Sequence, residues 1–311
     1  IAQYEQILAS GQIPPNSPLF LYNVYGKSPS EQYPDPRLAM NKFGANAFMN
    51  YTISDSVSID LSIGLQQSEV QKVFLSNIFN ASIPFTVNKT NSAYANLAAK
   101  VYGLNVRASY LPGSDNLALN MTPNRYDYNI ADASAEYTFK LGKLGTLVPG
   151  VNYQSAVYND KDYTGAQQLT FLGGRDRSIT TSSAFVRTDL KPSKHWRVIA
   201  AVRGDKFSTP DEVYFAYEFA TTYKINAANL VRAAVTRSNS GSFIANNYLN
   251  FSLPQPPDPD FKRIGSTDLK LFTVQMYELG FRSQLSKELQ LDVDVFHQRS
   301  ENFTALVLSD L

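Results

Sequence analysis

One stretch near the start of the chain decides the fold, because apolar residues occupy every second position of it. Residues 43–53 read FGANAFMNYTI, and residues 57–65, after the turn Ser54-Asp55-Ser56, read VSIDLSIGL. In the second segment the odd positions are all Val, Ile or Leu, and the even positions are Ser, Asp or Gly. A helix would spread these apolar residues around its axis, whereas a strand places them on one face. The stretch therefore predicts a β-hairpin with one apolar and one polar face.

The same alternation recurs along the chain and predicts about twelve strands in all, many of about ten residues. Ten residues is about the length that a tilted strand needs to cross a bilayer. The further predicted strands are residues 93–101, 104–110, 131–141, 147–157, 179–190, 196–202, 213–223, 230–237, 273–283 and 289–295.

The connections between these strands alternate between short turns and longer polar segments. This asymmetry is typical of outer-membrane barrels, which have short periplasmic turns and longer extracellular loops. A soluble β-sandwich has shorter strands and no such two-sided bias. The predicted long loops are residues 67–90, 112–124, 158–178, 208–212 and 238–272.

The predicted fold class is therefore all-β, a transmembrane antiparallel β-barrel. In lipid every backbone polar group must be paired, so a β protein can span the bilayer only as a closed barrel. The polar strand face then lines a water-filled or plugged interior. The residues expected on this face are Asp60, Asn96, Lys100, Asn105, Arg107, Asp132, Glu136, Lys140, Asn152, Gln154, Arg232, Glu278, Arg282, Asp292 and Asp294.

Composition narrows the function classes. The chain has 311 residues, 43% hydrophobic and 18% charged, which excludes disorder. Its net charge of +1 favours no nucleic-acid partner, and the absence of cysteine excludes thiol, iron–sulfur and disulfide chemistry. No nucleophile–base–acid set stands out, so we predict no enzyme, no cofactor and no metal centre. The acidic segments 159–162 and 258–260 lack the spacing of a known calcium loop, and the sequence leaves open whether they bind calcium.

Two regions go beyond a generic barrel. They are residues 227–238, AANLVRAAVTRS, and residues 277–296, which begin Tyr277-Glu278-Leu279-Gly280 and end in Phe296. Together they resemble the barrel of TonB-dependent outer-membrane receptors. This resemblance implies a barrel of about twenty-two strands with an N-terminal plug. Residues 1–311 would then be part of one barrel domain, with the plug and the C-terminal strands absent from this chain.

The resemblance also implies site residues. In the family a wall glutamate at the position of Glu278 faces inward and pairs with plug arginines. Glu278, Arg282 and Arg232 are therefore the expected plug-contacting residues of the lumen wall. The family's companion segment is replaced here by Asn239-Ser240-Gly241-Ser242.

The function implied is TonB-dependent active import of a scarce nutrient across the bacterial outer membrane. The ligand could be a siderophore or other metal chelate, a glycan, a peptide or a vitamin. Expected partners are outer-membrane lipid, the TonB complex acting through the plug, the small ligand and a possible surface lipoprotein. Tyr248, Phe251 and Phe261, in the longest loop, are the candidate ligand-facing residues. The alternatives are a passive porin-like channel and a structural or secretion-associated barrel that binds partner proteins.

Overall fold

A computed structural model describes residues 40–76, 81–119, 122–163, 170–255 and 258–304. Its main feature is one antiparallel sheet of 13 strands, in the order β1-β2-β3-β4-β5-β7-β8-β9-β10-β11-β14-β15, with β6 paired to β7. The elements are β1 (Met40–Ser54), β2 (Val57–Ser76), β3 (Ala81–Val101), β4 (Leu104–Leu119), β5 (Thr122–Tyr137), β6 (Phe139–Lys140), β7 (Gly145–Asn159), η3 (Lys161–Tyr163), β8 (Asp176–Leu190), β9 (Trp196–Phe207), β10 (Val213–Lys224), β11 (Asn229–Asn239), α3 (Ile244–Tyr248), β12 (Asn250–Gln255), β13 (Asp258–Ile264), β14 (Thr273–Gln284) and β15 (Gln290–Glu301).

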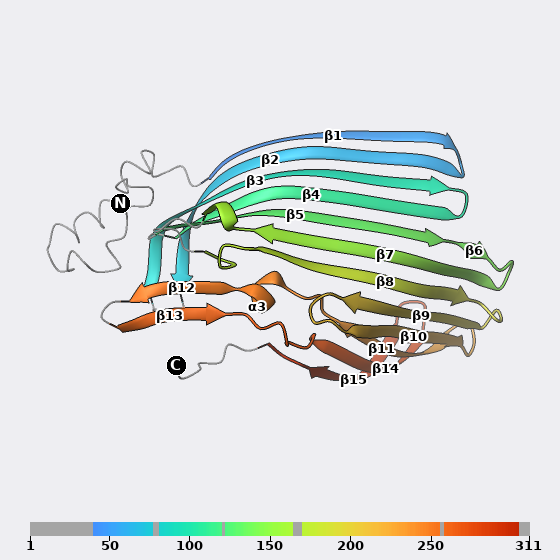
Figure 1. The fold of residues 1–311 in the computed structure, drawn as a ribbon. Coiled ribbons are helices and arrows are strands. Elements are labelled where there is room, and N and C mark those ends of the chain that lie inside the picture. The colour runs from blue at the N-terminus through green and yellow to red at the C-terminus, as the bar shows by residue number, and fades with distance from the viewer. Residues whose placement is uncertain (1–39, 77–80, 120–121, 164–169, 256–257, 305–311) are drawn as a thin grey trace.

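Each of the predicted strands lies within or overlaps a strand of this sheet, so the all-β fold class is confirmed. The strands run side by side as a curved wall (Figure 1). The short turns gather at one end of this wall, and α3 and the β12–β13 hairpin lie at the other (Figure 1). Among the described residues, none of the helices has the length and hydropathy to cross a membrane.

The two faces of the sheet differ in chemistry. One face exposes large apolar side chains, such as Leu97 (42% exposed), Phe219 (46%) and Val293 (47%). The buried apolar cluster is small by comparison and consists of Phe207, Tyr214 and Leu271. A sheet in water would bury such an apolar face against another layer. Here the face is left bare, as lipid-facing strands of a barrel require.

Two of the predicted long loops are wrong, because strand pairing continues through most of both. Residues 67–76 and 81–90 are paired in the β2–β3 ladder, and residues 112–119 and 122–124 in the β4–β5 ladder. Backbone pairing does not need one apolar face. Where both faces of a hairpin meet water, the alternation fades while the hydrogen-bond ladder continues.

The connection between β7 and β8 is organised by a buried carboxylate. Asp160 is fully buried and accepts backbone N–H hydrogen bonds from Leu172 (2.6 Å) and Arg175 (2.8 Å). Asp160 belongs to the predicted acidic segment 159–162. Both of its carboxylate oxygens thus bind backbone N–H groups of the connection. The side chains of the other acidic segment, 258–260, lie outside the described residues.

The connection between β11 and β14 is more ordered than the predicted loop of residues 238–272. It contains the short helix α3 and the antiparallel hairpin β12–β13. Its base is tied to the β7–β8 connection, where the N–H of Asn250 donates to the carbonyl of Phe171 at 2.9 Å. The alternation of apolar residues did not predict this hairpin, because its strands are short and contain proline.

Candidate functional site

The polar residues predicted for the lumen lie on one face of the sheet. Strand register sets this, since directly paired residues point to the same side. Asp60 of β2 pairs with Asn50 and Ala98, and Ala98 pairs with Arg107 of β4. At the other end of the sheet, Glu278 of β14 pairs with Phe296 of β15. We call this face the inner wall.

Three of the sequence-predicted site residues lie in a cluster of ion pairs on β11, β14 and β15. The guanidinium of Arg232 contacts both Asp294, with Nε to Oδ1 at 3.0 Å, and Glu278, with Nε to Oε1 at 3.3 Å. Arg282 pairs with Asp292, with Nε to Oδ2 at 2.8 Å. Two guanidinium groups therefore face three carboxylates, which leaves one negative charge in excess.

The pair Arg232–Asp294 crosses the strand that lies between its two partners. Register places Gly280 of β14 directly between them. A Cβ atom on Gly280 would stand 2.3 Å from Asp294 Oδ1 and 2.5 Å from Arg232 Nε. Glycine at this position is what lets the two side chains meet over the strand.

A second polar network runs across β5 to β9. Arg203 donates to Asp205 (2.6 Å) and to Ser183 (2.8 Å), and Asn152 donates to Asp132 (2.9 Å). Asp205 is 8% exposed, so its charge is balanced by Arg203 within the wall. Toward the short turns, Nη2 of Arg187 donates to both carboxylate oxygens of Glu136, at 3.0 and 3.1 Å.

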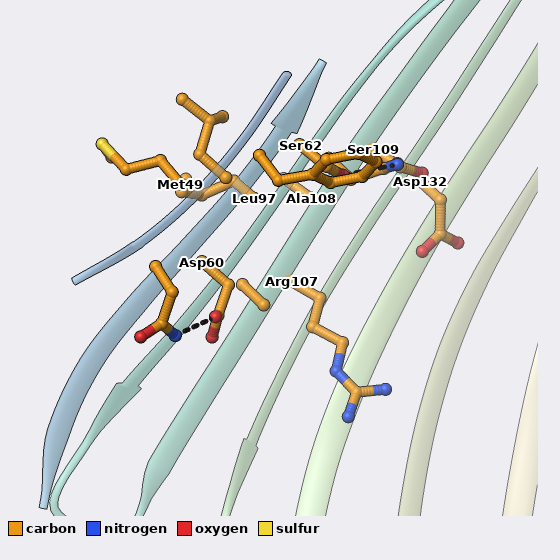
Figure 2. Close-up of a pocket in the computed structure, with 13 residues that line it drawn as sticks. Met49, Asp60, Ser62, Leu97, Arg107, Ala108, Ser109 and Asp132 are labelled. Atoms are coloured by element: carbon orange, nitrogen blue, oxygen red, sulfur yellow. Dashed lines mark hydrogen bonds between the residues drawn. The ribbon is translucent and has the colours of Figure 1, made fainter. Parts of the chain in front are cut away.

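The first strands of the wall carry a hollow of 550 Å³ with less complete charge pairing. Figure 2 shows Asp60, Arg107 and Asp132 around it, contributed by β2, β4 and β5. Met49 and Leu97 extend on the opposite side from Arg107 (Figure 2). Within the described residues, Arg107 makes no ion pair.

The candidate ligand-facing residues are placed only in part. Tyr248 ends α3 and is half-buried, with its hydroxyl 2.7 Å from Thr209 Oγ1 and its ring 5.0 Å from Arg177 Cζ. These contacts hold α3 against the wall. Phe251 and Phe261 belong to β12 and β13, opposite Arg263 and Leu253 respectively, and their side chains lie outside the described residues.

A cluster of aromatic rings near the long connections was missed by sequence reasoning. The ring centroid of Tyr126 lies 6.0 Å from that of Tyr158 and 5.5 Å from that of Phe171, and Tyr128 lies beside both tyrosines. Tyr128 and Tyr158 are paired residues of β5 and β7 on the inner wall. The signal was present as two tyrosines at alternate positions, 126 and 128, between the predicted loop 112–124 and the predicted strand 131–141, and as Tyr158 at the start of the predicted loop 158–178.

Outside the sheet, η3 brings a tyrosine against β5. The hydroxyl of Tyr163 donates to Asp127 at 2.8 Å, and the Arg125 guanidinium lies over its ring at 4.5 Å. Burial, followed by the bond to Asp127, raises the pKa of the Tyr163 hydroxyl above its ordinary value. The group therefore stays protonated and remains a hydrogen-bond donor at neutral pH.

A family model described as "TonB dependent receptor-like, beta-barrel" matches residues 9–310. The chain belongs to this family. The match covers the whole sheet, including the inner wall and its ion pairs. The resemblance predicted from residues 227–238 and 277–296 is thereby confirmed, and the sheet is part of the β-barrel of this receptor-like family.

Solved structures share this fold at low sequence identity. The siderophore receptor PirA from Pseudomonas aeruginosa matches with a TM-score of 0.64 and 11% identity, over 84% of this chain and 46% of its own. A mutant of the ferric enterobactin receptor PfeA, also from Pseudomonas aeruginosa, matches with a TM-score of 0.64 and 11% identity, over 84% and 43%. The FrpB iron transporter from Neisseria meningitidis matches with a TM-score of 0.58 and 14% identity, over 83% and 45%.

The chain thus spans less than half the length of these solved proteins. No curated protein sequence matches the chain.

Proposed function

We propose that this chain forms the wall of a transporter that actively imports a scarce nutrient across the bacterial outer membrane. The observation that carries the proposal is the inner wall itself. A dry core would not retain so many charged and amide side chains, whereas a water-filled interior or a polar plug satisfies them. Membership of the TonB-dependent receptor-like family adds the energy source, the TonB complex of the inner membrane.

Further strands complete the barrel in this proposal. In the described sheet, β1 and β15 each pair on one side only. An open strand edge cannot stand in lipid, because its N–H and C=O groups would find no partner there. The barrel of about twenty-two strands that the family resemblance implies would close both edges.

A plug domain fills the barrel and docks on Glu278. The cluster of Arg232, Glu278, Arg282, Asp292 and Asp294 carries one excess negative charge, which suits a plug arginine. Arg232 and Arg282 serve this contact indirectly, since both are held by wall carboxylates. The free guanidinium of Arg107 offers a second contact, to a plug carboxylate.

The other proposed partners follow from the barrel. Lipid covers the apolar face, the TonB complex pulls on the plug, and a small nutrient enters from the side of α3 and the β12–β13 hairpin. A surface lipoprotein that covers this side is a further proposed partner. The relatives named as siderophore and iron receptors make a ferric chelate one candidate ligand, beside glycans, peptides and vitamins.

An energised uptake assay tests the proposal. The full-length protein is produced in outer membranes of cells with and without a working TonB complex, and nutrient accumulation is measured under limitation. Active import predicts accumulation against the gradient that stops without TonB. The same protein in a planar bilayer should conduct poorly while its plug is in place. A steady open conductance with TonB-independent uptake would instead establish the porin-like alternative, and stable co-purifying subunits without uptake the partner-binding barrel.

A further inference from the structure

A second hollow, of 560 Å³, lies on the inner wall beneath α3 and the segment that leads into it. Its floor is formed by inner-wall residues of β7 to β9, including Gln154, Thr181 and Arg203, and its lip by residues 241–245. We call it the mouth hollow. α3, which borders the hollow, lies toward the end of the wall opposite the short turns (Figure 1). A ligand that arrives at that end would meet the hollow early.

The mouth hollow has no unbalanced charge. Among the described residues that line it, only Arg203 and Asp205 are charged, and they bind each other at 2.6 Å. Ser183 strengthens the pair, because it accepts from Arg203 and donates to Asp205. An anionic ligand would have to compete with Asp205 for the guanidinium and leave this nearly buried carboxylate unpaired, which is costly.

The rest of the lining combines neutral hydrogen-bonding groups with aromatic rings. Gln154 and Thr181 lie on the floor, and Ser238, Asn239 and Ser242 lie along the side. Phe243 stands at the lip with 61% of its surface exposed. Such an exposed ring beside an ordered site is free to stack on a ligand.

Tyr158 connects the mouth hollow to the aromatic cluster. It lines the hollow, and its ring centroid lies 6.0 Å from that of Tyr126 and 6.2 Å from that of Tyr128. Aromatic surface therefore continues from the hollow along the inner wall. A ligand longer than the hollow would find further rings to stack on.

We propose that the mouth hollow binds an uncharged, hydroxyl-rich ligand, namely a neutral oligosaccharide. A sugar ring presents hydroxyl groups at its rim and C–H groups on its faces. Amide and hydroxyl side chains satisfy the rim, and aromatic rings cover the faces. The balanced Arg203–Asp205 pair offers both donors and acceptors to such a ligand without requiring a ligand charge. This inference rests on the proposed import function and specifies its substrate class.

Binding of chosen probes to the purified full-length protein tests the proposal. The neutral probes are malto-, cello-, xylo- and fructo-oligosaccharides, and the anionic probe is ferric tris-catecholate, each followed by calorimetry. We expect at least one neutral probe to bind, with an affinity that changes less than about twofold between low and high salt. Binding of the ferric probe alone, with a steep salt dependence and a loss in Arg203→Gln, would overturn the inference, as would failure of every neutral probe.

Matched aromatic variants locate the site. Phe243→Ala should weaken binding of the neutral probe about tenfold, since a stacking ring is lost. Phe215→Ala is the control, because Phe215 is similarly exposed (58%) but lies on the lipid-facing side of β10. Equal losses in both variants, or no loss in Phe243→Ala, would place the sugar elsewhere.

Uptake separates this inference from the proposed function. If cells accumulate the ferric probe in a TonB-dependent way and ignore the oligosaccharides, the substrate class is wrong while active import stands. If no probe is accumulated and the protein conducts as an open pore, the import function itself is wrong.

Discussion

Gly280 shows how one residue without a side chain can organise three strands. Arg232 and Asp294 belong to β11 and β15, which are not neighbours in the sheet. Their contact exists because β14 presents a glycine where the two side chains cross. The contact in turn keeps Arg232 beside Glu278. The glycine of the Tyr277-Glu278-Leu279-Gly280 segment thus has a physical role in the inner wall.

Gly280→Ala should therefore destabilise the barrel. The new Cβ would overlap Asp294 and Arg232 and force the ion pair apart, at a cost of about 1–3 kcal/mol. The free energy of unfolding can be measured with denaturant on the full-length protein in detergent. Gly241→Ala is the control, because nothing lies within 4 Å of a Cβ placed there. Equal stabilities of the two variants would mean that the crossing pair contributes nothing.

Glu278→Gln tests the proposed plug contact. It removes the excess negative charge of the cluster while preserving shape, so the plug should dock less firmly and the channel should leak. Single-channel conductance of the full-length protein in a planar bilayer should rise. Glu136→Gln is matched to it, since Glu136 is also a wall carboxylate that pairs with an arginine, Arg187. If both variants stay closed, Glu278 is a structural wall residue only.

At the residue scale, the sequence predicted which face of the sheet a side chain occupies but not which residues it contacts. Alternation placed Arg232, Glu278 and Arg282 on the polar face, and register confirms that they share it. Alternation could not show that Arg232 meets Asp294, 62 positions away and two strands along the sheet. That contact depends on strand order, register and Gly280 together, and no single segment contains this information.

At the scale of elements, several strands are longer than the alternating segments from which they were predicted. Period-2 alternation arises because one side of a strand faces lipid and the other faces polar surroundings. This difference ends where the bilayer ends, although the strand itself can continue. The backbone ladders of the β2–β3 and β4–β5 hairpins continue beyond the alternating segments. The strands within the bilayer were therefore predictable, whereas the extensions above it, α3 and the β12–β13 hairpin were not.

Asp160 should control the order of the β7–β8 connection. Asp160→Ala removes a buried acceptor of two backbone N–H groups, so local opening should become at least about tenfold more frequent. Limited trypsin digestion of the folded protein should then cut faster between β7 and β8. The neighbouring Asp162 is exposed, and Asp162→Ala provides the control. Identical digestion of the two variants would show that the loop is held by Leu172 and its packing instead.

On the scale of the whole molecule, the sheet separates two solvents. Its apolar face replaces a protein core by lipid, and its polar face is satisfied by wall ion pairs, water and whatever enters the barrel. This explains why so few side chains are buried although the sheet is large. Stability depends on which face a side chain occupies, so the same substitution at two adjacent residues of one strand should cost different amounts of stability.

Leu97 and Asn96 provide that comparison on β3. Leu97 belongs to the apolar face and Asn96 to the inner wall, where its amide donates to Ser62. Adjacent in β3, the two residues lie at nearly the same height along the wall. Leu97→Arg places a charge in lipid and should cost about 2–4 kcal/mol, whereas Asn96→Arg should cost about 1 kcal/mol or less. Unfolding of the full-length protein reconstituted in phospholipid vesicles measures both. Equal costs would mean that the two faces meet the same solvent, which no transmembrane barrel permits.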